Sequence, residues 1–136
     1  MTFYERELER IFGDSDFLSA ETVITGKTLI SKIGVDLRAK IDFVTINVHK
    51  QYEALRLSII NRTQGVIDTH QFDFVDVIGR KNGYSPQIWE SDGQAKWFRF
   101  EPTYSDYRKL QSAVEEYIAI FADESMNYSG PSMDEM

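Results

Sequence analysis

The chain has 136 residues and a mass of 15.8 kDa, which suits a single domain whose core is large enough to fold without cross-links. It contains no cysteine, so disulfide frameworks, thiolate metal sites and cysteine nucleophiles are excluded. Its 15 basic and 22 acidic residues give a net charge of -7, the wrong sign for binding nucleic acid through phosphates. We expect a basic protein partner and no direct contact with nucleic acid.

The first predicted element is a short amphipathic helix that runs from Phe3 to about Phe12. Thr2 is a suitable N-cap and Gly13 a suitable end. The apolar side chains recur at helical spacing, at Tyr4, Leu8, Ile11 and Phe12. These first residues also carry charges where a signal peptide would need its apolar core, and no run approaches about 18 apolar residues. We therefore predict a cytoplasmic protein without a membrane segment.

The middle of the chain reads as antiparallel strands, because apolar and polar residues alternate between turn-forming segments. The predicted strands cover residues 22–25, 29–33, 37–43, 55–59, 66–67, 72–78, 87–90 and 95–100. The apolar phase shifts between Phe74 and Val75, which predicts a β-bulge or a change of partner sheet. Residues 87–100 predict a hairpin around the turn Ser91-Asp92-Gly93.

A second helix is predicted from Thr103 to Phe121. Thr103 and Asp106 have the spacing of a capping box, and an apolar stripe follows at Tyr107, Leu110, Val114, Tyr117, Ile118 and Phe121. Residues 123–136 show no periodicity and no basic residue, which is typical of a flexible acidic tail. The predicted fold is a single α+β domain over residues 1–122, with an antiparallel sheet of five or six strands and a helix at each end.

The sequence offers little support for catalysis. His49 and His70 are the only histidines, and neither lies at metal-ligand spacing from another. Acid–base catalysis by paired carboxylates needs one of them desolvated, yet pairs such as Asp73 with Asp76 lie in segments patterned for exposure. We therefore predict a protein that is not an enzyme and that needs no cofactor or metal.

Basic and aromatic residues interleave over about twenty positions of the second half of the chain. They are Arg80, Lys81, Tyr84, Trp89, Lys96, Trp97 and Arg99. Three interpretations remain open: the rings fill the core of a hairpin while the bases stay in water, the set forms a protein-binding patch, or it stacks nucleic-acid bases.

Negative charge gathers at the two ends of the sequence. Residues 5–21 and residues 123–136 each carry a net charge of -4, whereas the segment between them carries +1. This pattern is typical either of solvated surfaces or of a field that steers a basic partner. As a protein-binding set we predict Glu5, Glu7, Glu9, Asp14 and Asp16 for steering, with Tyr84, Trp89 and Trp97 as aromatic anchors.

Several segments resemble small proteins encoded on conjugative and transposable elements of Gram-positive bacteria. The resemblance covers Phe3 to about Phe121 and contains no catalytic signature. It lies in residues 3–8 and 11–13, 36–40 and 43–45, 52–55, 61–63 with Gly65, and 85–89 with Trp97.

Accessory genes of such elements often encode anti-defence proteins, including anti-CRISPR inhibitors, many of which are small, acidic and non-enzymatic. The resemblance therefore implies an inhibitor that binds a basic host protein, such as a Cas9-type nuclease with its Arg- and Lys-rich channels. The alternative is a structural or regulatory protein of the element's own transfer or maintenance machinery.

Overall fold

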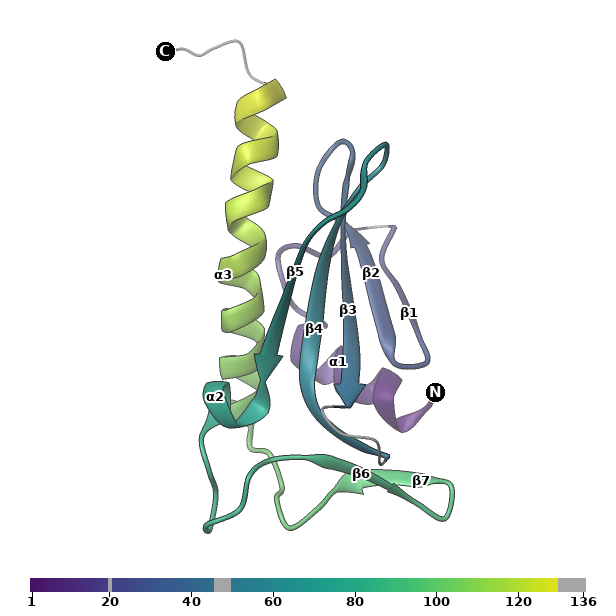
Figure 1. Ribbon diagram of the computed structural model, residues 1–136, viewed down its shortest axis with the longest axis vertical. Coiled ribbons are helices and arrows are strands. Elements are labelled where there is room, and N and C mark those ends of the chain that lie inside the picture. The colour runs from purple at the N-terminus through teal and green to yellow at the C-terminus, as the bar shows by residue number, and fades with distance from the viewer. Residues whose placement is uncertain (20, 46–49, 130–136) are drawn as a thin grey trace.

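The computed structural model describes residues 1–19, 21–45 and 50–129, with side chains as far as Phe121. In chain order its elements are α1 (Phe3–Phe12), β1 (Val23–Thr25), β2 (Thr28–Lys32), β3 (Leu37–Thr45), β4 (Gln51–Asn61), β5 (Gly65–Asp73), α2 (Phe74–Ile78), β6 (Ile88–Ser91), β7 (Gln94–Trp97) and α3 (Tyr104–Ser129). Figure 1 shows a curled sheet with α3 along one side and the β6–β7 hairpin across its lower end.

All the strands belong to one antiparallel sheet with the order β1-β2-β3-β4-β6-β7. The long strand β4 also pairs with β5. Its residues 54–61 pair with β5, and its residues 51–52 pair with β6. The predicted α+β fold with an antiparallel sheet and a helix at each end is confirmed. The sheet has seven strands, more than the five or six expected.

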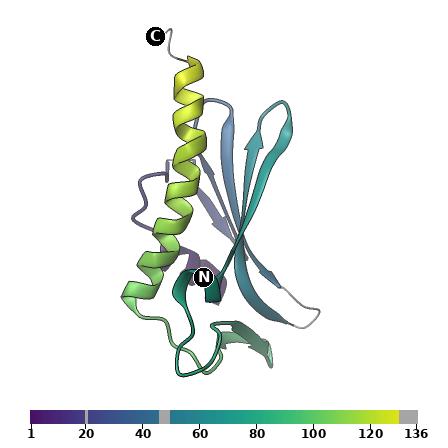
Figure 2. The same ribbon diagram turned by 60° about the vertical axis from the view of Figure 1, so that its left-hand side comes forward.

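The core lies on the face of β3 and β4 that α1 and α3 cover. Cross-strand pairs such as Ile41 with Leu57 and Ala39 with Ile59 are fully buried there. Leu8 of α1 and Leu110 of α3 are also fully buried in this cluster. Figure 2, turned by 60°, shows α3 standing on one side of the sheet. Strand alternation and helix periodicity therefore meet in one core, as the two patterns predict.

The predicted starts of the two main helices are confirmed by their capping contacts. The Thr2 hydroxyl accepts from the Glu5 backbone N–H at 3.1 Å, and the Glu5 carboxylate accepts from the Thr2 N–H at 2.7 Å. Thr103 and Asp106 make the same reciprocal pair, at 3.2 Å and 2.8 Å, where α3 begins. Each pair satisfies two backbone donors that a helix start otherwise leaves free.

The sequence interpretation of residues 72–78 as a bulged strand is wrong. Strand β5 ends at Asp73 and the short helix α2 starts at Phe74, which is fully buried. The shift in apolar phase marks the change from a two-residue to a helical period. The register of β4 is irregular elsewhere, between Ile59 and Ile60 against β5.

The helix was predicted to end at Phe121, the last residue of the apolar stripe, but α3 continues to Ser129. Of the segment predicted as an acidic tail, residues 130–136 lie outside the described residues. Within the described part of the chain, no helix is both long enough and apolar enough to cross a membrane.

Candidate functional site: a basic and aromatic cleft

An open cleft of about 970 Å³ lies at the lower end of the molecule, where α1, β7 and the start of α3 converge. Its lining comes from three residues of α1, the turn at residues 81–82, the end of β7, and the segment 99–104 with Tyr107. We refer to it below as the cleft. Segments far apart in the sequence therefore share one surface.

Glu7 is the polar centre that joins these segments. Its side chain is only 1% exposed. One carboxylate oxygen, Oε1, accepts from the Trp97 indole N–H at 2.9 Å and from the Tyr107 hydroxyl at 2.5 Å. The other, Oε2, lies 3.0 Å from the Arg10 guanidinium. A buried carboxylate is stable only with such donors. Since two of them come from β7 and α3, the contacts of Glu7 hold α1 to both elements.

The surroundings of Tyr107 keep its hydroxyl protonated. Burial, together with the hydrogen bond to the Glu7 carboxylate, raises the pKa of Tyr107 above its usual value. The neutral hydroxyl therefore stays a donor to Glu7 at neutral pH.

Asp106 is a second buried carboxylate beside the cleft, also 1% exposed. The Lys81 ammonium lies 3.2 Å from Asp106 Oδ1, although the two atoms are not aligned as a hydrogen bond. Burial works against the charged form of Asp106, but the Thr103 backbone N–H and Lys81 outweigh it and lower its pKa. Two buried carboxylates thus each position one cation at the cleft.

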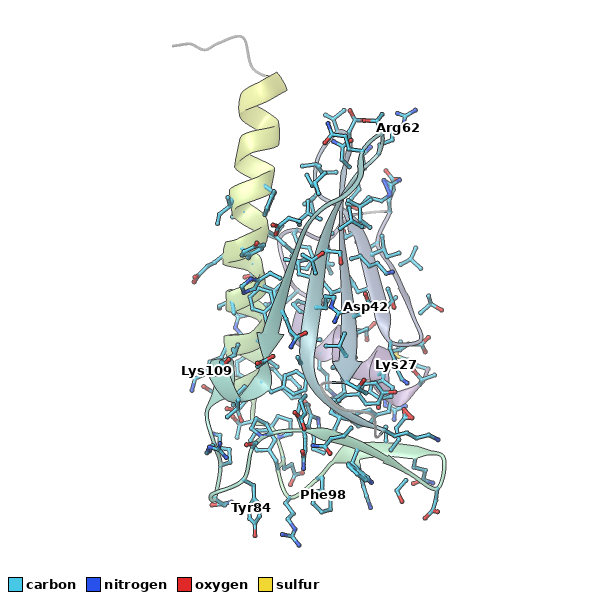
Figure 3. All side chains as sticks on the ribbon, viewed as in Figure 1. Lys27, Asp42, Arg62, Tyr84, Phe98 and Lys109 are labelled. Carbon is cyan, nitrogen blue, oxygen red and sulfur yellow. The ribbon has the colours of Figure 1, made fainter. Side chains whose placement is uncertain are left out.

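An exposed arginine lies over two aromatic rings at the rim of the cleft. The Arg99 guanidinium carbon lies 5.1 Å from the centre of the Tyr84 ring and 5.2 Å from that of Phe98. Arg99 also donates to the Tyr84 hydroxyl at 3.2 Å, and the Trp89 ring lies 6.3 Å from that of Phe98. We call Tyr84, Trp89, Phe98 and Arg99 the arginine–aromatic cluster. Figure 3 shows Tyr84 and Phe98 at the same lower end of the molecule.

The backbone that presents this cluster is conformationally unusual. Arg99 has a φ of 53°, in the left-handed region that residues other than glycine seldom adopt. Asn82 and Gly83 also have positive φ values, of 51° and 81°, and Lys81 and Tyr84 exchange backbone hydrogen bonds across them. This is the geometry of a tight two-residue turn for which Asn-Gly is well suited. The turn sets Tyr84 beside Arg99.

The hairpin register separates the two tryptophans that the sequence grouped together. Ile88 pairs with Trp97 and Trp89 pairs with Lys96, so the tryptophans lie on opposite faces of the hairpin. Trp97 lines the cleft and packs against the buried Phe100 ring at 5.4 Å. Trp89 belongs to the cluster, and Lys96, which shares its face of the hairpin, lies at the edge of the cleft lining. The core-filling interpretation therefore holds for one face of the hairpin, while the other face leaves Phe98 40% exposed.

The acidic residues predicted to steer a partner have different environments in the structure. Glu7 is buried, so its prediction as an exposed steering residue is wrong. A sequence signal existed, because Glu7 stands three residues after Tyr4 and four before Ile11, on the apolar face of α1.

Two more of these residues make contacts within the chain, and two are free in solvent. Glu5 caps α1 and accepts from the Gly26 N–H at 2.8 Å. Asp14 accepts from the Gln111 amide at 2.5 Å. Glu9 and Asp16 are exposed, so they remain accessible to a partner.

A second polar cluster, which the sequence analysis missed, fastens the β6–β7 hairpin to α1. The Lys27 ammonium lies 3.1 Å from Glu90, which also accepts from the Tyr4 hydroxyl at 3.2 Å. Lys27 sits 4.3 Å from the centre of the Tyr52 ring. Burial disfavours the Lys27 charge, yet Tyr52 and Glu90 outweigh it and raise the Lys27 pKa. These internal partners give the cluster a structural role.

The histidines form no metal site within the described residues. His70 is exposed and stacks on Tyr117, with ring centres 4.7 Å apart. His49 lies outside the described residues. In the part of the chain that the structure describes, no three His, Cys, Asp or Glu side chains are grouped so that they could hold a metal ion.

Comparisons with known proteins do not identify a family for this chain. No family model, no curated protein and no solved structure matches it. The resemblance to proteins of mobile elements therefore stays a prediction, and the site rests on its own geometry.

Proposed function

We propose that this chain is a non-enzymatic protein-binding module, and that the arginine–aromatic cluster with the adjoining cleft is its contact surface. The observation that carries the proposal is Arg99, whose guanidinium lies over two rings that are 44% and 40% exposed. Arginine, tyrosine and tryptophan dominate the energetic centres of protein interfaces. A stacked arginine also loses less side-chain freedom on binding than a free one.

The internal contacts of the buried carboxylates favour binding over catalysis. Glu7 already accepts three hydrogen bonds, and Asp106 is held by its capping partner and Lys81. A general acid or base needs an accessible oxygen aimed at a reacting group. Both carboxylates instead organise the cleft wall.

The class of partner that we propose comes from the resemblance. The chain would act as an inhibitor carried by a mobile element, of the anti-CRISPR type, that blocks a Cas9-type nuclease. Glu9 and Asp16 would speed its encounter with a basic protein, since exposed charges act mainly on association rates. The second candidate is an accessory role in the element's own transfer or maintenance machinery.

The test is target cleavage by a panel of RNA-guided nucleases from Gram-positive hosts, with and without excess protein. We expect stoichiometric loss of cleavage with one nuclease, and an inhibition constant raised at least about tenfold by Arg99→Ala or Phe98→Ala, equivalent to about 1.4 kcal/mol. Arg62→Ala is the matched control, because Arg62 lies at the opposite end of the molecule in Figure 3 and its side chain is 79% exposed.

Two results would contradict these proposals. Normal cleavage across the panel, with no complex detected, would reject the inhibitor in favour of the accessory role. Inhibition that survives both cluster substitutions would reject the proposed contact surface.

A further inference from the structure

We infer that the cleft binds an acidic linear segment of the partner protein, with carboxylates of that segment paired to Lys96 and Arg99. This inference rests on the proposed function and extends it by naming the chemistry of the bound segment. It differs from the sequence expectation, in which this chain supplies the acidic side of the contact. A protein of either net charge can carry such a segment, so the inference does not depend on the overall charge of the partner.

The first support is a local reversal of charge. The cleft is lined by four basic residues, which come from different parts of the chain, and by two acidic ones, Glu7 and Glu101. This is an excess of positive charge in a chain whose net charge is -7. The four bases are Arg10, Lys81, Lys96 and Arg99. This local excess of positive charge would attract an anionic segment.

The second support is the difference between paired and unpaired cations in the cleft. Arg10 and Lys81 are each held by a carboxylate that is 1% exposed. Among the described residues, no carboxylate lies within 4.0 Å of Lys96 or Arg99. The charges of these two exposed residues therefore have no ion-pair partner in that part of the chain. A bound carboxylate would supply one.

The third support is the apolar part of the lining. Tyr104 is 76% exposed and Trp97 is half-buried, both on the cleft. A volume of about 970 Å³ lies near the upper end of the range for ligand pockets, roughly 300 to 1,000 Å³. The cleft therefore has room for one large apolar side chain between two acidic ones. In a segment with this composition, the acidic side chains would pair with Lys96 and Arg99 and the apolar one would pack against Trp97 and Tyr104.

Single-stranded nucleic acid is the competing polyanion, and the charge distribution disfavours it. Proteins bind single strands along an extended row of cations, whereas this cleft offers only two cations without an ion-pair partner among the described residues, with Glu101 on the same lining. A short peptide confines its negative charge to the cleft. We therefore assign the site to a peptide and keep nucleic acid as an outcome of the test.

The experiment measures binding of fluorescein-labelled probes to the full chain by anisotropy. The probes are a short peptide in which glutamates flank one phenylalanine, the same peptide with glutamines, and an oligothymidylate of equal length. We expect the glutamate peptide to bind best. Lys96→Glu should weaken its binding at least about tenfold, equivalent to about 1.4 kcal/mol, and Lys96→Gln should weaken it less.

Arg62→Glu is the matched control, because it makes the same charge change on an exposed side chain at the far end of the molecule. We expect it to change the affinity less than about twofold, since screening limits charges beyond about 8 Å at physiological salt. An equal loss with Arg62→Glu would indicate a general field effect and overturn the inference. Thermal melting of each variant separates weaker binding from unfolding.

The remaining outcomes separate this inference from the proposed function. If the glutamate peptide binds no better than the glutamine peptide, or if Lys96→Glu has no effect, the inference is wrong. The proposed function would still stand if Arg99→Ala and Phe98→Ala relieve inhibition of the nuclease. Tighter binding of the oligothymidylate than of the glutamate peptide would assign the cleft to nucleic acid instead.

Discussion

The interior face of the sheet and the region around Glu7 are both buried, but different interactions hold them together. On the sheet, Ile41, Leu57 and Ile59 are fully buried among other apolar side chains. Around Glu7, one carboxylate accepts hydrogen bonds from α1, β7 and α3. The first region depends on many weak, non-directional contacts and the second on a few directional ones.

This difference decides how each region responds to substitution. An apolar side chain in the sheet can be replaced by another of similar volume at low cost. A donor or acceptor around Glu7 cannot, because its removal leaves a buried partner unsatisfied. Two substitutions test this contrast and a third extends it to Asp106, the other buried carboxylate beside the cleft, from the largest expected effect to the smallest.

The largest effect is expected for Leu57→Ala in the centre of β4. Leu57 is fully buried and pairs with Ile41 and His70 on the two neighbouring strands. The lost apolar contact and the cavity should lower the free energy of unfolding by about 2 to 5 kcal/mol. Urea denaturation measures this change. Ile67→Ala, at a position 42% exposed on β5, is the control and should cost about 0.5 kcal/mol or less.

A smaller but more specific effect is expected for Glu7→Gln. Glutamine fits the space, yet it presents an amide N–H₂ either to Arg10 or to the Trp97 and Tyr107 donors. We expect the free energy of unfolding to fall by about 1 to 3 kcal/mol. The double variant with Tyr107→Phe should lose less than the sum of the two single losses, because both substitutions remove the same hydrogen bond.

Glu9→Gln is the control for this carboxylate, since Glu9 lies on the same helix and is exposed. It should change the free energy of unfolding by about 0.5 kcal/mol or less. Equal effects of Glu7→Gln and Glu9→Gln would show that the Glu7 contacts contribute nothing to stability. Strict additivity with Tyr107→Phe would contradict a shared hydrogen bond.

The smallest effect is expected for Asp106→Asn, and it should depend on pH. The folded protein lowers the pKa of Asp106, so its carboxylate stabilises the fold above the unfolded pKa, and this contribution is lost as pH falls through the folded value. The variant should be less stable by roughly 1 kcal/mol at neutral pH, and the difference should shrink below about pH 4. Thermal melting across this range measures it, and a difference independent of pH would contradict the role of the Asp106 charge.

Local patterns in the sequence predicted most of the fold because they act over a few residues. Alternation over 37–43 identified β3, and capping residues identified the starts of α1 and α3. The same reasoning failed at Phe74, where the apolar phase alone cannot distinguish a bulge from a helix start. It also failed for Glu7, which we predicted to be exposed because it is charged, although it lies on the apolar face of α1.

The sequence by itself therefore determined the class of fold, the two main helices, the hairpins and the apolar core of this protein. Only the tertiary structure decided that Glu7 accepts from Trp97 and Tyr107, that Trp89 and Trp97 face opposite ways, and that Arg99 meets Tyr84. The Glu7 contacts join residues 90 and 100 positions apart. No local period encodes such pairs, because each exists only once the packed elements bring its donor and acceptor together.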